Sequence, residues 1–279
     1  MTPGLFRENA PIRRINREAV VLGGAGYAVL MQVAHPAVSR GVYEHSDFAV
    51  RPVNRLRGTL TFVYGQVFGT REEAERVARI VRAMHTKVNG PGYDALDPDL
   101  QLWVAATLYD SGTRLYELTL GPLAPEEKDA AYQQASIFAT SLGCPRDTWP
   151  SSRAEFDAYW ERMIASMEVD DSARAITRSL FNPANPLLRP FVRLQGFLAA
   201  GLLPPRIREQ LGLAWSAKRQ RTFDRLFAVL RTVYPRFPMT VRTLPMRAYL
   251  WDMRRQARRN RLYRRPRRTA RTRRHHQRN

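Results

Sequence analysis

The sequence is organised around Arg79-Ile80-Val81-Arg82-Ala83-Met84-His85-Thr86-Lys87-Val88-Asn89-Gly90. A helix of about 20 residues is predicted here, because Thr70 and Glu73 form a capping box at its start and Asn89-Gly90 followed by proline stops it. Its apolar residues recur at spacings of four, three and four: Val77, Val81, Met84 and Val88. This pattern predicts a face toward the core, and His85 shares that face.

His85 is a candidate metal ligand. A neutral imidazole that points into an apolar interior is what a haem iron takes as an axial ligand. A core histidine hydrogen-bonded to a backbone carbonyl fits the same pattern, so the residues alone leave both interpretations open. His85 has no Glu-x-x-His or His-x-x-x-His partner, the spacings that set two ligands on one helical face. A non-haem metal would need ligands from separate helices, whereas a porphyrin iron needs only one, and this favours haem.

Two neighbouring segments are predicted to bring polar groups to the same region. Pro36 begins a new helix, which holds His35 at a break where its ring can enter a cavity as a distal group or second ligand; a helix-capping role is the alternative. The next predicted helix runs from Pro52 to Phe68, and Arg55 and Thr59 project from adjacent turns on one side of it. Arginine can bind a haem propionate, and threonine can hydrogen-bond bound oxygen. Taken alone, the pair is also an ordinary helix surface.

Four segments resemble successive motifs of the MpaB-type oxygenase and latex clearing protein (rubber oxygenase) family. They are Gln32-Val33-Ala34-His35-Pro36-Ala37-Val38, Arg55-Leu56-Arg57-Gly58-Thr59, Val81-Arg82-Ala83-Met84-His85 and Trp103-Val104-Ala105-Ala106-Thr107-Leu108. The resemblance covers roughly residues 15 to 250. It implies an all-helical protein that binds haem b and cleaves isoprenoid carbon–carbon double bonds with dioxygen.

The resemblance also implies roles for single residues. His85 matches the proximal haem ligand, Arg55 and Thr59 match polar residues beside the haem, and Arg82, from the same motif as His85, is expected to bind the cofactor. Gly58 departs from the rubber-cleaving branch, where a distal lysine stands at this position. The resemblance therefore implies haem binding more directly than it implies the reaction, and a non-catalytic haem or lipid-binding protein is the alternative. The predicted catalytic residues are His35, Arg55 and Thr59.

Length and composition agree with a large helical protein. The chain has 279 residues, of which 44% are hydrophobic and 10% aromatic, enough for a substantial core. We expect an all-α fold in which residues 15–253 form a single multi-helix domain around a haem pocket, preceded by an arm at 1–14. The single Cys144 excludes an intramolecular disulfide and Cys-rich zinc or iron–sulfur sites.

The positive charge is concentrated at one end. The net charge is +20, and residues 251–279 contain 13 arginines but only one acidic residue, which accounts for +12. Residues 254–279 are therefore predicted to be an Arg-rich tail that is disordered or partly helical and solvated. Such a tail would bind anionic lipid or nucleic acid through charge, without base-specific recognition.

Targeting signals are not evident. Residues 19–39 form a 21-residue stretch without charge, but three glycines, Gln32, His35 and Pro36 predict a buried helix rather than a membrane span. The first ten residues do not resemble a secretory signal. We expect a cytoplasmic protein, compatible with peripheral attachment to a membrane, whose partners are dioxygen and an apolar small molecule.

Two other patterns concern packing. Gly23, Gly24 and Gly26 are predicted to give a helix a smooth surface on which another helix or a flat ring can pack. The later half reads as helices separated by prolines, among them 187–200 and 216–233. An apolar stripe in the first of these helices is expected to close a substrate cavity or to dock on the first half: Phe191, Leu194, Phe197 and Leu198.

Overall fold

The computed structural model describes residues 3–45, 52–183 and 185–263, except for the side chains of 52–55 and 260–263. Its elements, in chain order, are α1 (Pro11–Asn16), the 3₁₀ helix η1 (Ala19–Gly24), α2 (Ala25–Ala34), α3 (Pro36–His45), α4 (Pro52–Phe68), α5 (Arg71–His85), β1 (Asn89–Gly90), β2 (Tyr93–Asp94), α6 (Pro98–Leu120), α7 (Pro125–Ala135), α8 (Ile137–Thr140), η3 (Arg146–Thr148), α9 (Arg153–Ser166), α10 (Asp171–Phe181), η4 (Pro186–Leu188), α11 (Arg189–Leu202), α12 (Pro205–Gln210), α13 (Ala217–Val233), η5 (Tyr234–Arg236), α14 (Met239–Arg242) and α15 (Leu244–Tyr263). The predicted all-α class is confirmed, and the fold forms one globular domain.

Local signals account for the helix ends. The Thr70 side chain accepts from the Glu73 N–H at 3.2 Å, and the Glu73 carboxylate accepts from the Thr70 N–H at 2.9 Å, which confirms the capping box that starts α5. Asp97 caps α6 through the Asp99 N–H at 2.8 Å. Gly121, with φ of 95°, ends α6 in a backbone conformation that only glycine adopts readily.

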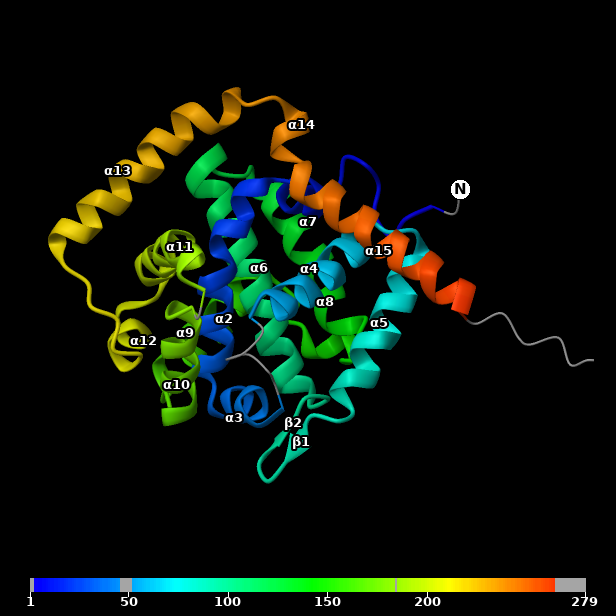
Figure 1. Ribbon diagram of the computed structural model, residues 1–279, viewed down its shortest axis with the longest axis horizontal. Helices are drawn as coiled ribbons and strands as arrows, with labels where there is room; N and C mark the ends of the chain where they lie inside the picture. Colours follow the sequence, from blue (N-terminus) through cyan, green and yellow to red (C-terminus); the bar gives the residue numbers. More distant parts are fainter. Residues whose placement is uncertain (1–2, 46–51, 184, 264–279) are drawn as a thin grey trace, which may run out of the picture.

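Helix α6 is the central element of the core. Figure 1 shows it running through the middle of the molecule, with α3 and the β1–β2 hairpin gathered at one end. Trp103 of α6 is fully buried, stacks on Trp160 with ring centroids 5.2 Å apart, and donates its indole N–H to the Met31 carbonyl at 3.0 Å. The ring of this large side chain is thus packed in the core, and its single polar group, the indole N–H, is hydrogen-bonded there.

The small residues of η1 and α2 pack against other helices. A methyl group added at Gly24 would collide with Ser111 Oγ and come within 3.0 Å of Leu115, both on α6. A methyl group added at Gly26 would lie 3.4 Å from the Ala199 side chain of α11. Of the two predicted partners for this smooth surface, a helix and a flat ring, the structure shows a helix.

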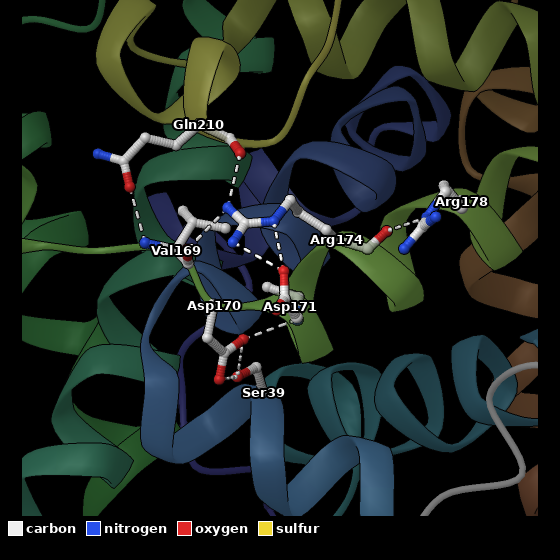
Figure 2. A network of polar contacts seen from close by, with 8 residues as sticks. Ser39, Val169, Asp170, Asp171, Arg174, Arg178 and Gln210 are labelled. Carbon is white, nitrogen blue, oxygen red and sulfur yellow. Dashed lines mark hydrogen bonds and ion pairs between the residues drawn. The ribbon is translucent and has the colours of Figure 1, made fainter.

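Helix α10 is tied to α3 at its first turn. Ser39, completely buried on α3, donates its hydroxyl to the Asp170 carboxylate at 2.8 Å, and Asp170 caps α10 by accepting from the Ala173 N–H at 2.8 Å. One turn further, Arg174 binds Asp171 and the backbone carbonyls of 169 and 210 (Figure 2). These contacts fix α10, and through it the direction in which the chain enters α11.

Several expectations about segment boundaries need correction. The expected N-terminal arm contains helix α1, whose Ile12 is only 2% exposed and belongs to the core. The Asn16 side chain donates back to the Ile12 carbonyl at 2.9 Å, within α1. The expected tail begins at Arg254, whereas the structure describes α15 as helical through Tyr263; residues 264–279 lie outside the described residues.

The predicted core face of α5 is also only partly correct. Val77 is buried, but Met84, two turns later on the same face, is 62% exposed. The reason is that α4 does not cover the end of α5. The two helices touch at Val77, where Gly65 leaves room for its side chain, and the last turns of α5 extend beyond this contact. The prediction that Met84 faces the core is therefore wrong.

No single helix in the described residues is both long enough and apolar enough to cross a membrane. The stretch Ala19–Ala34 and the helix Pro36–His45 reach those values only as a pair, and the pair bends by 106° at the break between them.

Candidate functional site

The candidate site begins at the open end of the α4–α5 hairpin. Only Gly69 and Thr70 separate the two helices, so α5 must fold back along α4. The contact between Gly65 and Val77, and the Gln66 side chain that donates to the Ala74 carbonyl at 2.9 Å, hold the closed end of the hairpin. The N-terminal part of α4 and the C-terminal part of α5 form the opposite, open end of the hairpin, beyond these contacts.

His85 is the last residue of α5 and lies at that open end. Its imidazole is half-buried, as are Val81 one turn before it and Val88 after it. Val88 lies against α3, since a methyl group added at Gly41 would contact Val88 at 3.4 Å and Tyr93 at 3.3 Å. His85 thus lies three residues before Val88, which packs against α3 beside Tyr93 of the β1–β2 hairpin.

Thr59 lies on α4 on the open half of the same hairpin. It is half-buried, and the apolar face of α4 runs beside it through Leu60, Val63 and Val67, which are all buried. A methyl group added at Gly58 would meet no atom of the described residues within 4 Å. The Arg55 side chain lies outside the described residues.

Arg82 has a different surrounding. Its guanidinium donates to the Leu142 carbonyl at 2.8 Å and fills the space over Gly143, which has φ of 103°. The contact ties α5 to the turn after α8. Arg82 thus has a structural partner, and its expected contact with a cofactor stays a prediction.

His35 joins two helices. It follows the last residue of α2 with an extended backbone, and its Nδ1 accepts the Ala37 N–H at 3.2 Å, which caps α3. Because Nδ1 is an acceptor, the proton of the neutral ring must be on Nε2. Burial lowers the pKa of His35 from its ordinary value, and the nearby Asp97 carboxylate opposes this shift. The capping alternative is therefore correct for Nδ1, while Nε2 remains a donor for another group.

His45 ends α3 beside the β1–β2 hairpin. Its Nε2 lies 2.9 Å from the Tyr93 hydroxyl, which donates to the Glu44 carboxylate at 2.5 Å. The hydrogen bond to Glu44, together with burial, raises the pKa of Tyr93. This cluster joins α3 to the β1–β2 hairpin after α5.

Sequence reasoning missed a buried polar cluster between α2 and α6. The Tyr27 hydroxyl, on a side chain that is fully buried, donates to Asp110 at 2.5 Å, and Arg114 lies 3.8 Å from the same carboxylate. Arg114 also lies over the Tyr27 ring, at 5.6 Å, and donates to the Leu202 carbonyl at 2.9 Å. Burial raises the pKa of Asp110, although Arg114 and the Tyr27 hydroxyl favour its ionised form. The (i, i+4) spacing of Asp110 and Arg114 was the available signal.

Two cavities in the described residues lie away from these side chains. One, about 10 Å³, is lined by residues of α1, α6, α7 and α8, and another, about 200 Å³, by Phe181, Asn182, Pro183, Arg189 and Arg193. Neither lining contains His35, Thr59 or His85. Across 3–45, 52–183 and 185–263, no three His, Cys, Asp or Glu side chains come together as a metal-binding group.

The fold and this site define a class: an all-helical protein with one half-buried histidine at the open end of a helical hairpin. Residues 12–232 match the family described as ER-bound oxygenase mpaB/B'/Rubber oxygenase, catalytic domain, and the chain belongs to this family. An oxygenase, and hence an oxidoreductase, is the general activity that this membership supports.

Two curated relatives are similar over most of their length. They are uncharacterized protein Mb2261 of Mycobacterium bovis and uncharacterized protein Rv2237 of Mycobacterium tuberculosis, each 34% identical over 248 residues, which cover 84% of this chain and 96% of the relative. No solved structure matches the chain.

Proposed function

We propose that the protein is a haem-b-dependent oxygenase that acts on an apolar, isoprenoid or lipid-like substrate. The observation that carries the proposal is the position of His85 in a chain of this oxygenase family: a half-buried imidazole at the open end of the α4–α5 hairpin. A haem iron requires a single protein ligand of this kind.

Three residues of α4 support the proposal of a flat cofactor. Gly58 leaves the α4 backbone accessible, since nothing lies within 4 Å of the position its side chain would take. Thr59, the next residue, offers a half-buried hydroxyl that can donate or accept a hydrogen bond. Arg55, one turn before Thr59, would pair its guanidinium with a propionate carboxylate.

His85 would hold the iron, and the other residues would organise its surroundings. Bound haem supplies the dioxygen chemistry, while the protein positions the substrate and sets the polarity of the site. His35 is neutral at neutral pH because burial lowers its pKa. Its Nε2–H would serve as a hydrogen-bond donor to a group in the site, while Nδ1 keeps the ring oriented through the Ala37 N–H.

An absorption spectrum tests cofactor binding. The purified protein, supplied with haemin if necessary, is expected to show a Soret band that sharpens on reduction, and His85→Ala is expected to lose it. His45→Ala is the matched control. Its imidazole lies 2.9 Å from the Tyr93 hydroxyl, so its removal is expected to leave the spectrum unchanged. A wild-type protein that gives no ligand-type spectrum with haemin would rule out the proposal.

Turnover separates an oxygenase from a carrier. The reduced protein is exposed to dioxygen with polyisoprene, a carotenoid or an unsaturated fatty acyl chain. Cleavage of the double bond should yield two carbonyl groups, each with one oxygen atom from dioxygen. Thr59→Val should lower the rate while the Soret band persists, since it removes the hydroxyl and keeps the shape. A haem-loaded protein that forms no carbonyl product with any of these substrates would instead be a haem or lipid carrier.

A further inference from the structure

An apolar face leaves the core along α11 and reaches solvent. Leu198 is buried, but the same helical face continues one and two turns earlier through side chains that are exposed, and extends into η4. The exposed fractions are 48% for Leu194, 56% for Phe191, 39% for Leu188 and 85% for Leu187. Large apolar side chains gathered on one exposed face usually mark a binding surface. We call η4 and the first half of α11, residues 186–195, the α11 tip.

The sequence around the α11 tip is basic. Residues 172–208 contain six arginines and no aspartate or glutamate. Arg174 and Arg178 are engaged with the backbone and with Asp171 of α10 (Figure 2). Arg189 and Arg193, on the tip itself, make neither a hydrogen bond nor an ion pair with any residue that the structure describes. Their charges are therefore available to a ligand.

The two free arginines also line a cavity. It has a volume of about 200 Å³, and Phe181, Asn182 and Pro183 form the rest of its wall. The start of α11 is at the same place, where no side chain caps it, the Arg189 N–H donates to the Pro186 carbonyl of η4, and Pro190 has no N–H. The attraction for an anion here therefore comes from the two guanidinium groups.

We propose that the α11 tip docks on an anionic phospholipid bilayer. A lipid phosphate would enter the cavity between Arg189 and Arg193, where guanidinium groups can bind it bidentately. Leu187, Phe191 and Leu194 would reach the boundary of the acyl chains, as the apolar face of an interfacial helix does. This docking does not depend on the identity of the cofactor.

Charge and polarity distinguish the bilayer from other occupants. A second copy of this chain would bring the same arginines against each other without an acidic residue between them. A nucleic acid would meet a surface whose centre is leucine and phenylalanine. An anionic bilayer offers a negative surface directly above an apolar interior, which matches both features of the tip.

A fluorescent probe locates the contact. Leu187→Cys carries an environment-sensitive dye such as NBD, and Ile80→Cys, 55% exposed on α5, is the control. The natural Cys144 is 5% exposed, and burial raises the pKa of its thiol, so it should remain unlabelled. Phosphatidylglycerol vesicles should shift the dye emission to the blue at position 187 and not at 80. Equal responses at the two positions, or none at 187, would overturn the proposal.

Charge variants test the anion site in the full-length protein. Arg189→Gln with Arg193→Gln should weaken binding to phosphatidylglycerol vesicles by roughly 30-fold at low ionic strength. Arg71→Gln with Arg79→Gln removes two exposed charges from α5 and is the matched control, while the Arg-rich C-terminal segment contributes equally to both. Equal loss in the two double variants would show binding by charge alone and refute a built site.

The remaining occupants give different results. A change in the dye emission at position 187 with millimolar inorganic phosphate, together with no binding to vesicles, would identify a site for free phosphate. This result would overturn membrane docking. A blue shift at 187 that rises with protein concentration without lipid would identify a second copy. A response to DNA and not to vesicles would identify a nucleic-acid surface.

Discussion

At the scale of single residues, His35 connects the sequence to the site most directly. The proline after it made a helix break predictable. The sequence also reduced the role of the ring to two possibilities, a helix cap or a group in the pocket. The structure assigns Nδ1 to the cap through the Ala37 N–H at 3.2 Å, and this leaves Nε2 for a ligand. One ring nitrogen therefore serves the fold, and the other is left for the role proposed above.

Asparagine at position 35 tests this arrangement, because its side-chain oxygen can keep the cap but cannot titrate. Burial lowers the pKa of His35 in the folded protein, so the unfolded chain binds a proton first as the pH falls below about 6.5. The wild type should therefore lose free energy of unfolding relative to His35→Asn between pH 7.5 and 5. Urea unfolding across that range measures it, and a constant difference would contradict the prediction.

At the scale of elements, small residues decide which helices approach closely. Gly24 allows η1 to reach α6, where Ser111 donates its hydroxyl to the Gly24 carbonyl at 3.0 Å. Gly58, in the middle of α4, has no neighbour within 4 Å of an added methyl group. The two glycines look alike in the sequence, and only their surroundings distinguish them.

Alanine substitutions should separate these two cases. Gly24→Ala should lower the free energy of unfolding by about 1–3 kcal/mol, because the added methyl group overpacks the contact with Ser111 and Leu115. Gly58→Ala should raise it by about 0.5–1 kcal/mol, because alanine is the better helix former and meets no obstacle. Thermal and urea unfolding give both values. A destabilised Gly58→Ala would show that the space beside α4 is occupied.

At the scale of the whole molecule, a buried ion pair joins the two ends of the domain. Glu18, 1% exposed, accepts from two nitrogens of Arg242 at 2.9 and 2.8 Å and from the Tyr234 hydroxyl at 3.1 Å. It thereby connects η1 to η5 and α14, more than 200 residues later. A second pair, Arg57 with Asp252, links α4 to α15 at the surface, at 2.5 Å.

The two pairs should differ in their effect on stability. Glu18→Gln leaves the Arg242 guanidinium buried without its counter-charge and should cost about 3 kcal/mol. Asp252→Asn removes a pair that is open to solvent and should cost less than about 1 kcal/mol. Urea unfolding at fixed pH compares them, and salt should weaken only the effect at Asp252. Similar costs would contradict the role given to Glu18.

Local signals in the sequence determined the helices and much of their boundaries. The capping box at Thr70, the Asp97 cap and the stop at Gly121 depend on neighbours within four residues, so they could be predicted without a fold. The same holds for the α4–α5 hairpin that carries His85 and Thr59. Only the tertiary structure decided which faces are covered: it exposes Met84, buries Tyr27 against Asp110, and joins Glu18 to Arg242. The physical reason is distance along the chain, because burial and charge pairing depend on segments that local sequence patterns do not contain.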